Sequence, residues 1–192
     1  MTISYFLFFH DRADPNRRIT SAELARFSDI AASTPQLVRA HLYTPAHARD
    51  PYTNDPAPPA LAAQLYFDDL PELEAALAPH GHLQVLARPD TLPSLAGAEV
   101  QQQAMLVRSF PVVDAAFHNA PGTHPCTFLV EYPGAAADFN AWLWHYVVHH
   151  PPLMVQLPGV RDVEICTRLD WCGHLPWPRV DRMQRNKVVF DS

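Results

Sequence analysis

The sequence predicts an α+β protein made of two ferredoxin-like βαββαβ repeats, the second of which is incomplete at its C-terminus. Segments near the N-terminus recur near the C-terminus at a constant spacing, and apolar runs of strand length alternate with short helical patterns. In addition, 20 of the 192 residues are proline. Because proline breaks helix interiors, this share argues against a bundle of long helices. A chain of this length can form one large domain or two small ones.

The internal repeat rests on three pairs of segments that follow each other in the same order. Residues 5–9 (YFLFF) resemble 128–132 (FLVEY), 35–39 (PQLVR) resemble 158–161 (PGVR), and 65–69 (LYFDD) resemble 188–192 (VVFDS). The spacing is 123 residues, apart from a one-residue deletion within the middle pair. A single match would be noise, but three collinear matches indicate a tandem duplication.

The first copy contains the patterns of strand, helix, strand, strand, helix and strand in that order. Residues 3–9 form a buried apolar strand, and 21–32 carry apolar residues at helical spacing behind Thr20 or Ser21 as the N-cap. The following elements are strands at 37–43 and 61–67, a helix at 70–77, an irregular segment at 83–98 and a strand at 100–112. This order is typical of an antiparallel four-stranded sheet with both helices on one face.

The second copy repeats the order only in part, with a strand at 126–132, a helix at roughly 135–150, a strand at 160–169 and a strand near 187–190. We therefore assign residues 1–113 to the first repeat, 114–125 to a surface linker and 126–192 to the second repeat. Long loops at 44–59 and 170–185 occupy corresponding places in the two copies. Proteins usually cover a sheet edge. We therefore expect that the gene product continues past Ser192 or that another chain covers the second sheet.

Composition excludes several classes of partner. The chain has 14 basic and 20 acidic residues, a formal net charge of −6, and Lys187 as its single lysine. Such a chain is not expected to bind nucleic acid or a membrane surface. We expect a cytoplasmic protein, because no apolar stretch reaches the roughly 18 residues of a membrane span and the N-terminus lacks the features of a signal peptide. An odd set of cysteines, Cys126, Cys166 and Cys172, indicates reduced thiols.

Residues 139–154 (FNAWLWHYVVHHPPLM) form the segment with the most side chains that could take part in catalysis or ligand binding. On a helix, Tyr146 and His150 share a face, Trp142 lies one turn before Tyr146, and His145 shares a face with His149. The prolines at 151 and 152 should loosen the helix and leave the histidines near a cavity. An imidazole has an unperturbed pKa of about 6.5 and suits a general base, but a histidine at a helix end can equally bind the last carbonyls.

A metal site is the weaker interpretation of the same helix. His145 and His149 have a spacing that could ligate a metal, with Cys172 or His174 as further ligands. No carboxylate holds a fixed third position, however. We therefore expect no metal.

The stretch from His150 to Met154 (HPPLM), followed by residues 157–160 (LPGV), resembles the EthD domain, a branch of the dimeric α+β barrel proteins. Phe139, Trp142 and Tyr146 match its aromatic helix, and the likeness covers about 70 residues of the second copy. The first copy lacks the motif. The resemblance implies a pseudo-dimeric α+β barrel in which the first copy is a structural half and the second bears the site.

Proteins of the fold that this resemblance implies include monooxygenases without metal or flavin, muconolactone-type isomerases, and decarboxylases and dehydratases of aromatic polyketides. They share an apolar cavity between the sheet and its helices. For this chain the resemblance implies a small hydrophobic ligand of aromatic, polyketide-like or lactone/carbonyl type, no obligatory cofactor, and association as a homodimer or higher oligomer. A shared fold does not define the reaction.

We therefore expect an EthD-like enzyme with His150 as general base and Tyr146 orienting it or binding a substrate carbonyl. Pockets lined by aromatic side chains with a few polar groups are typical small-molecule sites. The further side chains expected to contact the substrate are Trp142, His149, Leu153, Trp171 and Trp177. The alternative is a non-catalytic binding or accessory module that sequesters such a metabolite or supports an oxygenase. A third hypothesis is a structural role through self-association.

Overall fold

A computed structural model describes residues 1–46 and 57–192, so most of the predicted loop at 44–59 lies outside the described residues. The elements are, in order, β1 (Ile3–His10), α1 (Ser21–Ser33), β2 (Arg39–Tyr43), β3 (Leu61–Phe67), α2 (Leu70–Leu77), η1 (His82–Ala87), η2 (Pro93–Leu95), β4 (Glu99–Phe110), β5 (Cys126–Tyr132), α3 (Phe139–Met154), β6 (Val160–Arg168) and β7 (Gln184–Phe190). The predicted order of elements is confirmed. The irregular approach to β4 contains the two short 3-10 helices η1 and η2.

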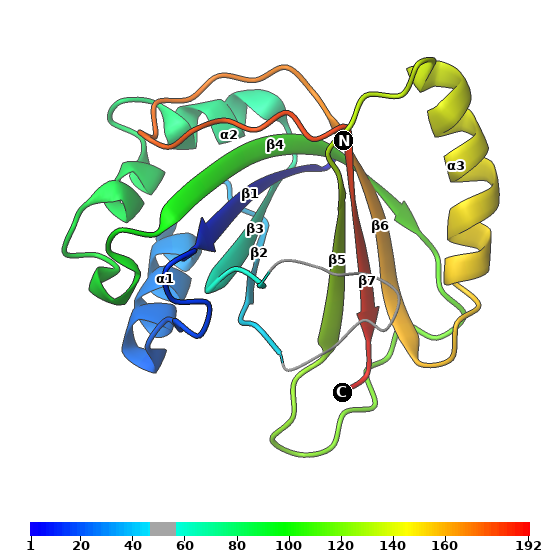
Figure 1. Cartoon of the computed structure of the whole chain (residues 1–192), viewed down its shortest axis with the longest axis horizontal. Helices are drawn as coiled ribbons and strands as arrows, with labels where there is room; N and C mark the ends of the chain where they lie inside the picture. Colours follow the sequence, from blue (N-terminus) through cyan, green and yellow to red (C-terminus); the bar gives the residue numbers. More distant parts are fainter. Residues whose placement is uncertain (47–56) are drawn as a thin grey trace. The chain divides into compact units, whose positions relative to one another are not determined.

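The strands form one sheet of seven in the order β2-β3-β1-β4-β6-β7-β5, and the pairings of known register are antiparallel. The chain divides into two compact units within β4. The first unit is Met1–Ala104 with Asp170–Val180, and the second is Met105–Leu169 with Asp181–Ser192. In Figure 1, α1 and α2 accompany the strands of the first unit, and α3 runs alongside β5, β6 and β7 of the second.

The strand pairings repeat from one copy to the other. Ile3 pairs with Phe67 between β1 and β3, and Cys126 pairs with Phe190 between β5 and β7. Ala40 pairs with Leu65 between β2 and β3, and Val163 pairs with Val188 between β6 and β7. Adding 123 to each residue number of the first copy gives its counterpart in the second. A tandem duplication requires this identity of register, because a slip of one residue would turn every side chain to the opposite face.

The predicted helix at roughly 135–150 is wrong at both ends. Asp138 is the N-cap of α3, since its side chain accepts a hydrogen bond from the backbone N–H of Ala141, and the helix continues through both prolines to Met154. The prolines lack an N–H but their carbonyls still accept, and Val155 donates to Pro151 at 2.9 Å. The last turn therefore survives where loosening was expected.

Glu23 connects the start of α1 to a distant loop. Its side chain and that of Thr20 form a capping box, and one carboxylate oxygen also accepts the backbone N–H of Ser94 at 2.6 Å. Burial by itself raises the pKa of Glu23, but the hydrogen bonds from Ser94 and Thr20 outweigh it and lower the pKa to about 2. The ionised carboxylate is therefore the form that the folded protein prefers.

We expect Glu23→Gln to lower the free energy of unfolding at pH 7 by about 2 kcal/mol, because it removes a buried charged acceptor. The folded-state pKa lies below the unfolded value of 4.5. This stabilisation is therefore fully present above pH 4.5 and lost as the pH falls toward 2. Urea unfolding at pH 7 and at pH 3 measures it. A difference between variant and wild type that is as large at pH 3 as at pH 7 would contradict the assignment.

In the second unit, β7 presents different side chains to its two faces. Asn186, Val188 and Phe190 line the face next to α3, and Val188 packs with Val160 and Val163 in an apolar cluster. Strand alternation directs Lys187 to the opposite face, where its Nζ lies 2.7 Å from Asp162 and 2.9 Å from Glu164. The single lysine of the chain is therefore a buried structural cation.

Strand β5 ends the sheet order, and in the described part of the chain it pairs with β7 alone. Large apolar side chains are exposed in the second unit, among them Phe128, Trp144, Val148, Leu153 and Leu157.

Among the described residues, no helix combines the length and the apolar character that a membrane span requires.

Candidate functional site

A pocket of about 300 Å³ lies in the second unit between α3 and the sheet. Its apolar wall consists of Phe128, Val130, Met154, Leu157, Val188 and Phe190. Its polar side chains are Tyr132, Tyr146, His150 and Asn186. The pocket is therefore mostly apolar, with few groups that can hydrogen-bond a ligand.

Helix α3 contributes one row of side chains to this pocket. Tyr146, His150 and Met154 follow each other at intervals of four residues, so they lie above one another on one side of the helix. The sequence prediction that Tyr146 and His150 share a face is confirmed. Leu153 belongs to the neighbouring row and is 65% exposed, so the structure does not bring it into the pocket.

Aromatic rings contact one another in a row along α3. The ring of Trp142 lies 5.1 Å from that of Tyr146, and the ring of Tyr146 lies 4.6 Å from that of His150. Trp142 also meets Tyr132 edge-on at 5.6 Å. Such pairs restrict ring rotation and add to the stability from burial. Trp142 thus supports the two tyrosines from behind, and it does not belong to the pocket lining.

A hydrogen-bonded cluster occupies the polar part of the pocket. The hydroxyl oxygens of Tyr132 and Tyr146 lie 3.1 Å apart. The Nδ2 of Asn186 donates to Tyr146 at 2.6 Å and to Tyr132 at 3.4 Å. Behind them the Nε2 of Gln184 donates to Oδ1 of Asn186 at 2.8 Å. Two strands and one helix therefore converge on two hydroxyl groups.

The hydroxyl of Tyr146 stays protonated. Burial and the hydrogen bond to Tyr132 raise the pKa of Tyr146 well above its ordinary value. A tyrosine of this kind donates or accepts a hydrogen bond in the neutral state and does not serve as a base.

His150 and His149 have different environments. His150 is an exposed residue that lines the pocket and touches the ring of Tyr146, and no hydrogen bond to its ring is found among the described residues. His149 lies outside the pocket, and its Nδ1 is 2.8 Å from the carbonyl oxygen of His145. The structure therefore does not bring His149 into the pocket, whereas the imidazole of His150 lines it.

Trp171 and Trp177 pack in the first unit and do not line this pocket. Their rings lie 5.6 Å from Tyr5 and 5.6 Å from Phe9, respectively. Tyr5 and Phe9 are the counterparts, 123 residues earlier, of the pocket residues Phe128 and Tyr132. The loop is held there by backbone donors, since Cys172 bonds Glu74 and His174 bonds Leu77, each at 2.9 Å.

In the first unit, residues 170–180, which follow β6 in the chain, therefore pack against the counterparts of the pocket residues. Trp171 and Leu175 are both nearly fully buried in this arrangement. The expectation that the two tryptophans contact a substrate rests on their place in the long loop of the second copy. The physical reason for the different outcome is that the loop 170–180 folds with the first unit.

Three polar residues of the site were missing from the sequence prediction: Tyr132, Gln184 and Asn186. Their counterparts in the first copy are Phe9, Leu61 and Ala63. A comparison of the two copies position by position would have shown that polar side chains replace apolar ones on one strand face. The helix alone, on which the prediction depended, does not contain this information.

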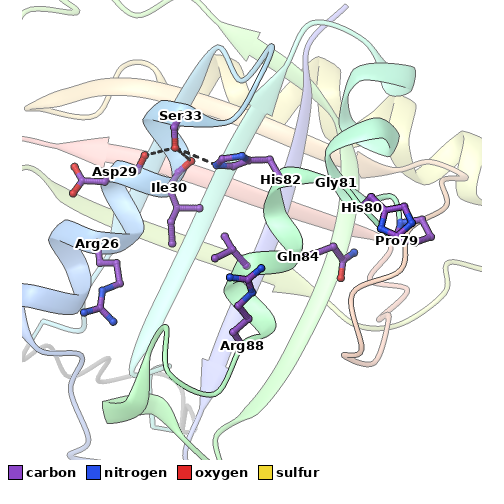
Figure 2. Close-up of a pocket in the computed structure, with 11 residues that line it drawn as sticks. Arg26, Asp29, Ile30, Ser33, Pro79, His80, Gly81, His82, Gln84 and Arg88 are labelled. Carbon is purple, nitrogen blue, oxygen red and sulfur yellow. Dashed lines mark hydrogen bonds between the residues drawn. The ribbon is translucent and has the colours of Figure 1, made fainter.

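A larger groove of about 630 Å³ lies in the first unit between α1 and residues 79–88. Figure 2 shows Ser33 of α1 facing His82, whose Nε2 lies 3.1 Å from the Ser33 hydroxyl. Arg26 donates to the carbonyl oxygens of Asp90 and Thr91. The rim of this groove carries exposed charged side chains, so the groove differs from the apolar pocket expected from the sequence.

Within residues 1–46 and 57–192, no group of three or more histidine, cysteine or acidic side chains is arranged to hold a metal ion. His145 and His149 have adjacent rings, with centroids 4.3 Å apart. The Nδ1 of His149 lies 2.8 Å from the carbonyl oxygen of His145.

No protein-family model and no curated protein matches the sequence. Among solved structures, the chain is similar to an anthrone oxidase-like protein, with a TM-score of 0.60 and 13% identity over 100% of this chain and 73% of that chain. It also aligns with a candidate monooxygenase from Lactobacillus acidophilus NCFM, with a TM-score of 0.47 and 13% identity over 98% and 76% of the two chains. At this identity, the first match shows that the α+β fold resembles that of the anthrone oxidase-like protein.

Proposed function

We propose that the pocket beside α3 binds a small, mostly apolar aromatic or carbonyl compound, and that His150 acts on it as a general base. The observation that carries the proposal is the convergence of Tyr132, Tyr146 and Asn186 in an otherwise apolar pocket of about 300 Å³. Apolar cavities with a few convergent polar groups are the typical sites of small-molecule ligands.

The proposed reaction is the removal of a proton from a carbon next to a carbonyl group, or from a phenol. The C–H or O–H bond breaks, the proton passes to the imidazole of His150, and the electron pair moves onto the substrate oxygen. A tyrosine hydroxyl donates to that oxygen as negative charge develops on it. Neither step requires a metal or an organic cofactor.

The proposal includes the family and the fuller description of the fold. We propose an EthD-like protein of two ferredoxin-like repeats in a pseudo-dimeric α+β barrel, with the site in the second, incomplete repeat. The identical strand register of the two copies supports the two repeats. The likeness to the anthrone oxidase-like protein supports the barrel type. The packing of residues 170–180 against the counterparts of the pocket residues in the first unit supports the choice of the second copy.

Binding is tested with 2-indanone, a bicyclic ketone, by isothermal titration calorimetry. We expect Met154→Trp to weaken binding at least roughly tenfold, because the larger side chain projects into the pocket that Met154 lines. The matched control is Leu153→Trp at the adjacent exposed position, which should leave the affinity within about a factor of two. Equal effects of the two substitutions, or no binding by the wild type, would overturn the proposed site.

A further inference from the structure

The hydrogen bonds of Gln184 and Asn186 determine which atoms of the Asn186 amide face the two tyrosines. Gln184 donates through Nε2 to Asn186, so the Oδ1 of Asn186 is occupied and its Nδ2 is turned toward the hydroxyl oxygens. In the described part of the chain, this is the one hydrogen bond of the Gln184 side chain, and its buried Oε1 has no partner. Among the described residues, the hydrogen bonding of the Gln184 side chain is therefore directed at Asn186.

The protons of the cluster can be counted. Tyr132 and Tyr146 have one hydroxyl proton each, and a single hydrogen bond lies between their oxygens. The Nδ2 of Asn186 supplies protons to both oxygens. One hydroxyl proton is therefore left over, and both tyrosines line the pocket. The cluster offers a donor to a ligand while its acceptor sites are largely used.

We propose that Gln184 is a positioning residue that orients Asn186 so that the pocket selects ligands presenting a hydrogen-bond acceptor, such as a carbonyl or phenolate oxygen. This inference rests on the proposed function and specifies the substrate class of the same site. At the two tyrosines, a ligand whose polar atom is only a donor would find the acceptor sites largely used, and an N–H placed there would lose the hydrogen bond it makes in water.

The opposite orientation of the amides would reverse this preference. If the carbonyl oxygen of Asn186 faced the tyrosines, both hydroxyl protons could be used within the cluster, and only lone pairs would remain for a ligand. The selectivity therefore depends on Gln184, which lies outside the pocket lining and would not touch the ligand.

The experiment compares three bicyclic probes of similar shape by calorimetry: 2-indanone, which only accepts, indole, which only donates, and indene, which does neither. We expect the wild type to bind 2-indanone about 2- to 12-fold more tightly than indene, and also more tightly than indole. In Gln184→Met the preference for 2-indanone over indole should fall at least about threefold, because Asn186 is then free to turn its amide.

The controls separate orientation from loss of structure. Gln156→Met replaces an exposed glutamine whose amide bonds the carbonyl of Pro152 at the end of α3, and it should leave the three affinities in the same ratio. A merely structural role of Gln184 would weaken all three probes together and leave their ratio unchanged, and this result would overturn the inference. If Gln184→Met does not fold, Asn186→Asp serves instead, since a carboxylate accepts both hydroxyl protons and should abolish the preference for 2-indanone.

The outcome for the wild type distinguishes the two proposals. Equal affinity for the three probes overturns the selectivity and leaves the pocket as a binding site. Failure to bind any of them overturns the proposed function, and the inference fails with it.

Discussion

Replacing His150 with glutamine is expected to slow the exchange of the acidic protons of 2-indanone roughly 10²- to 10⁴-fold, the contribution that a positioned general base typically makes. The imidazole lines the pocket with its ring tilted against that of Tyr146, and it has no hydrogen-bond partner among the described residues. Deuterium incorporation next to the carbonyl, followed by proton NMR in D2O, measures the rate. The affinity for 2-indanone should change by no more than a few fold, because Tyr132 and Tyr146 still bind the oxygen.

The matched control is His149→Gln on the same helix. His149 lies outside the pocket and bonds the carbonyl oxygen of His145, so its loss should leave the exchange rate within about a factor of two. Exchange that is equally fast in wild type and His150→Gln would show that His150 is not the base. Binding without any exchange above the buffer rate would favour the alternative, a binding module that sequesters such a compound.

Replacing Lys187 with methionine is expected to lower the free energy of unfolding by about 3–5 kcal/mol, the typical cost of removing one partner of a buried ion pair. The side chain of Lys187 is 0% exposed, and its amine lies between Asp162 and the 1% exposed Glu164. Without the amine, the carboxylate of Glu164 loses a charged partner in a place that water does not reach. Urea unfolding at pH 7 measures the effect.

A double variant tests whether the cost comes from the charge left behind. Lys187→Met together with Glu164→Leu removes both buried charges, so it should be less destabilised than the sum of the two single variants by at least about 1 kcal/mol. Additive effects, or a cost below about 1 kcal/mol for Lys187→Met alone, would show that the pair is not coupled as its geometry indicates.

The helical part of the site could be predicted from sequence because helical spacing is a local property. Tyr146 and His150 are four residues apart, and a helix brings such residues together wherever it lies. The sheet part depends on pairing between segments more than 50 residues apart, which placed Val130 opposite Asn186 and Tyr132 opposite Gln184. No local pattern around residues 184–190 marks Asn186 as a neighbour of Tyr146.

The sequence by itself determined the order of the elements and the repeat at 123 residues, because apolar periodicity and turn residues act over short distances. Only the tertiary structure decided that Trp171 and Trp177 pack against Tyr5 and Phe9 and that Gln184 and Asn186 stand behind two tyrosines. The physical reason is that a loop settles where it can bury the most apolar surface and satisfy its backbone donors. That place is set by packing between distant segments and not by the neighbours of the loop in the chain.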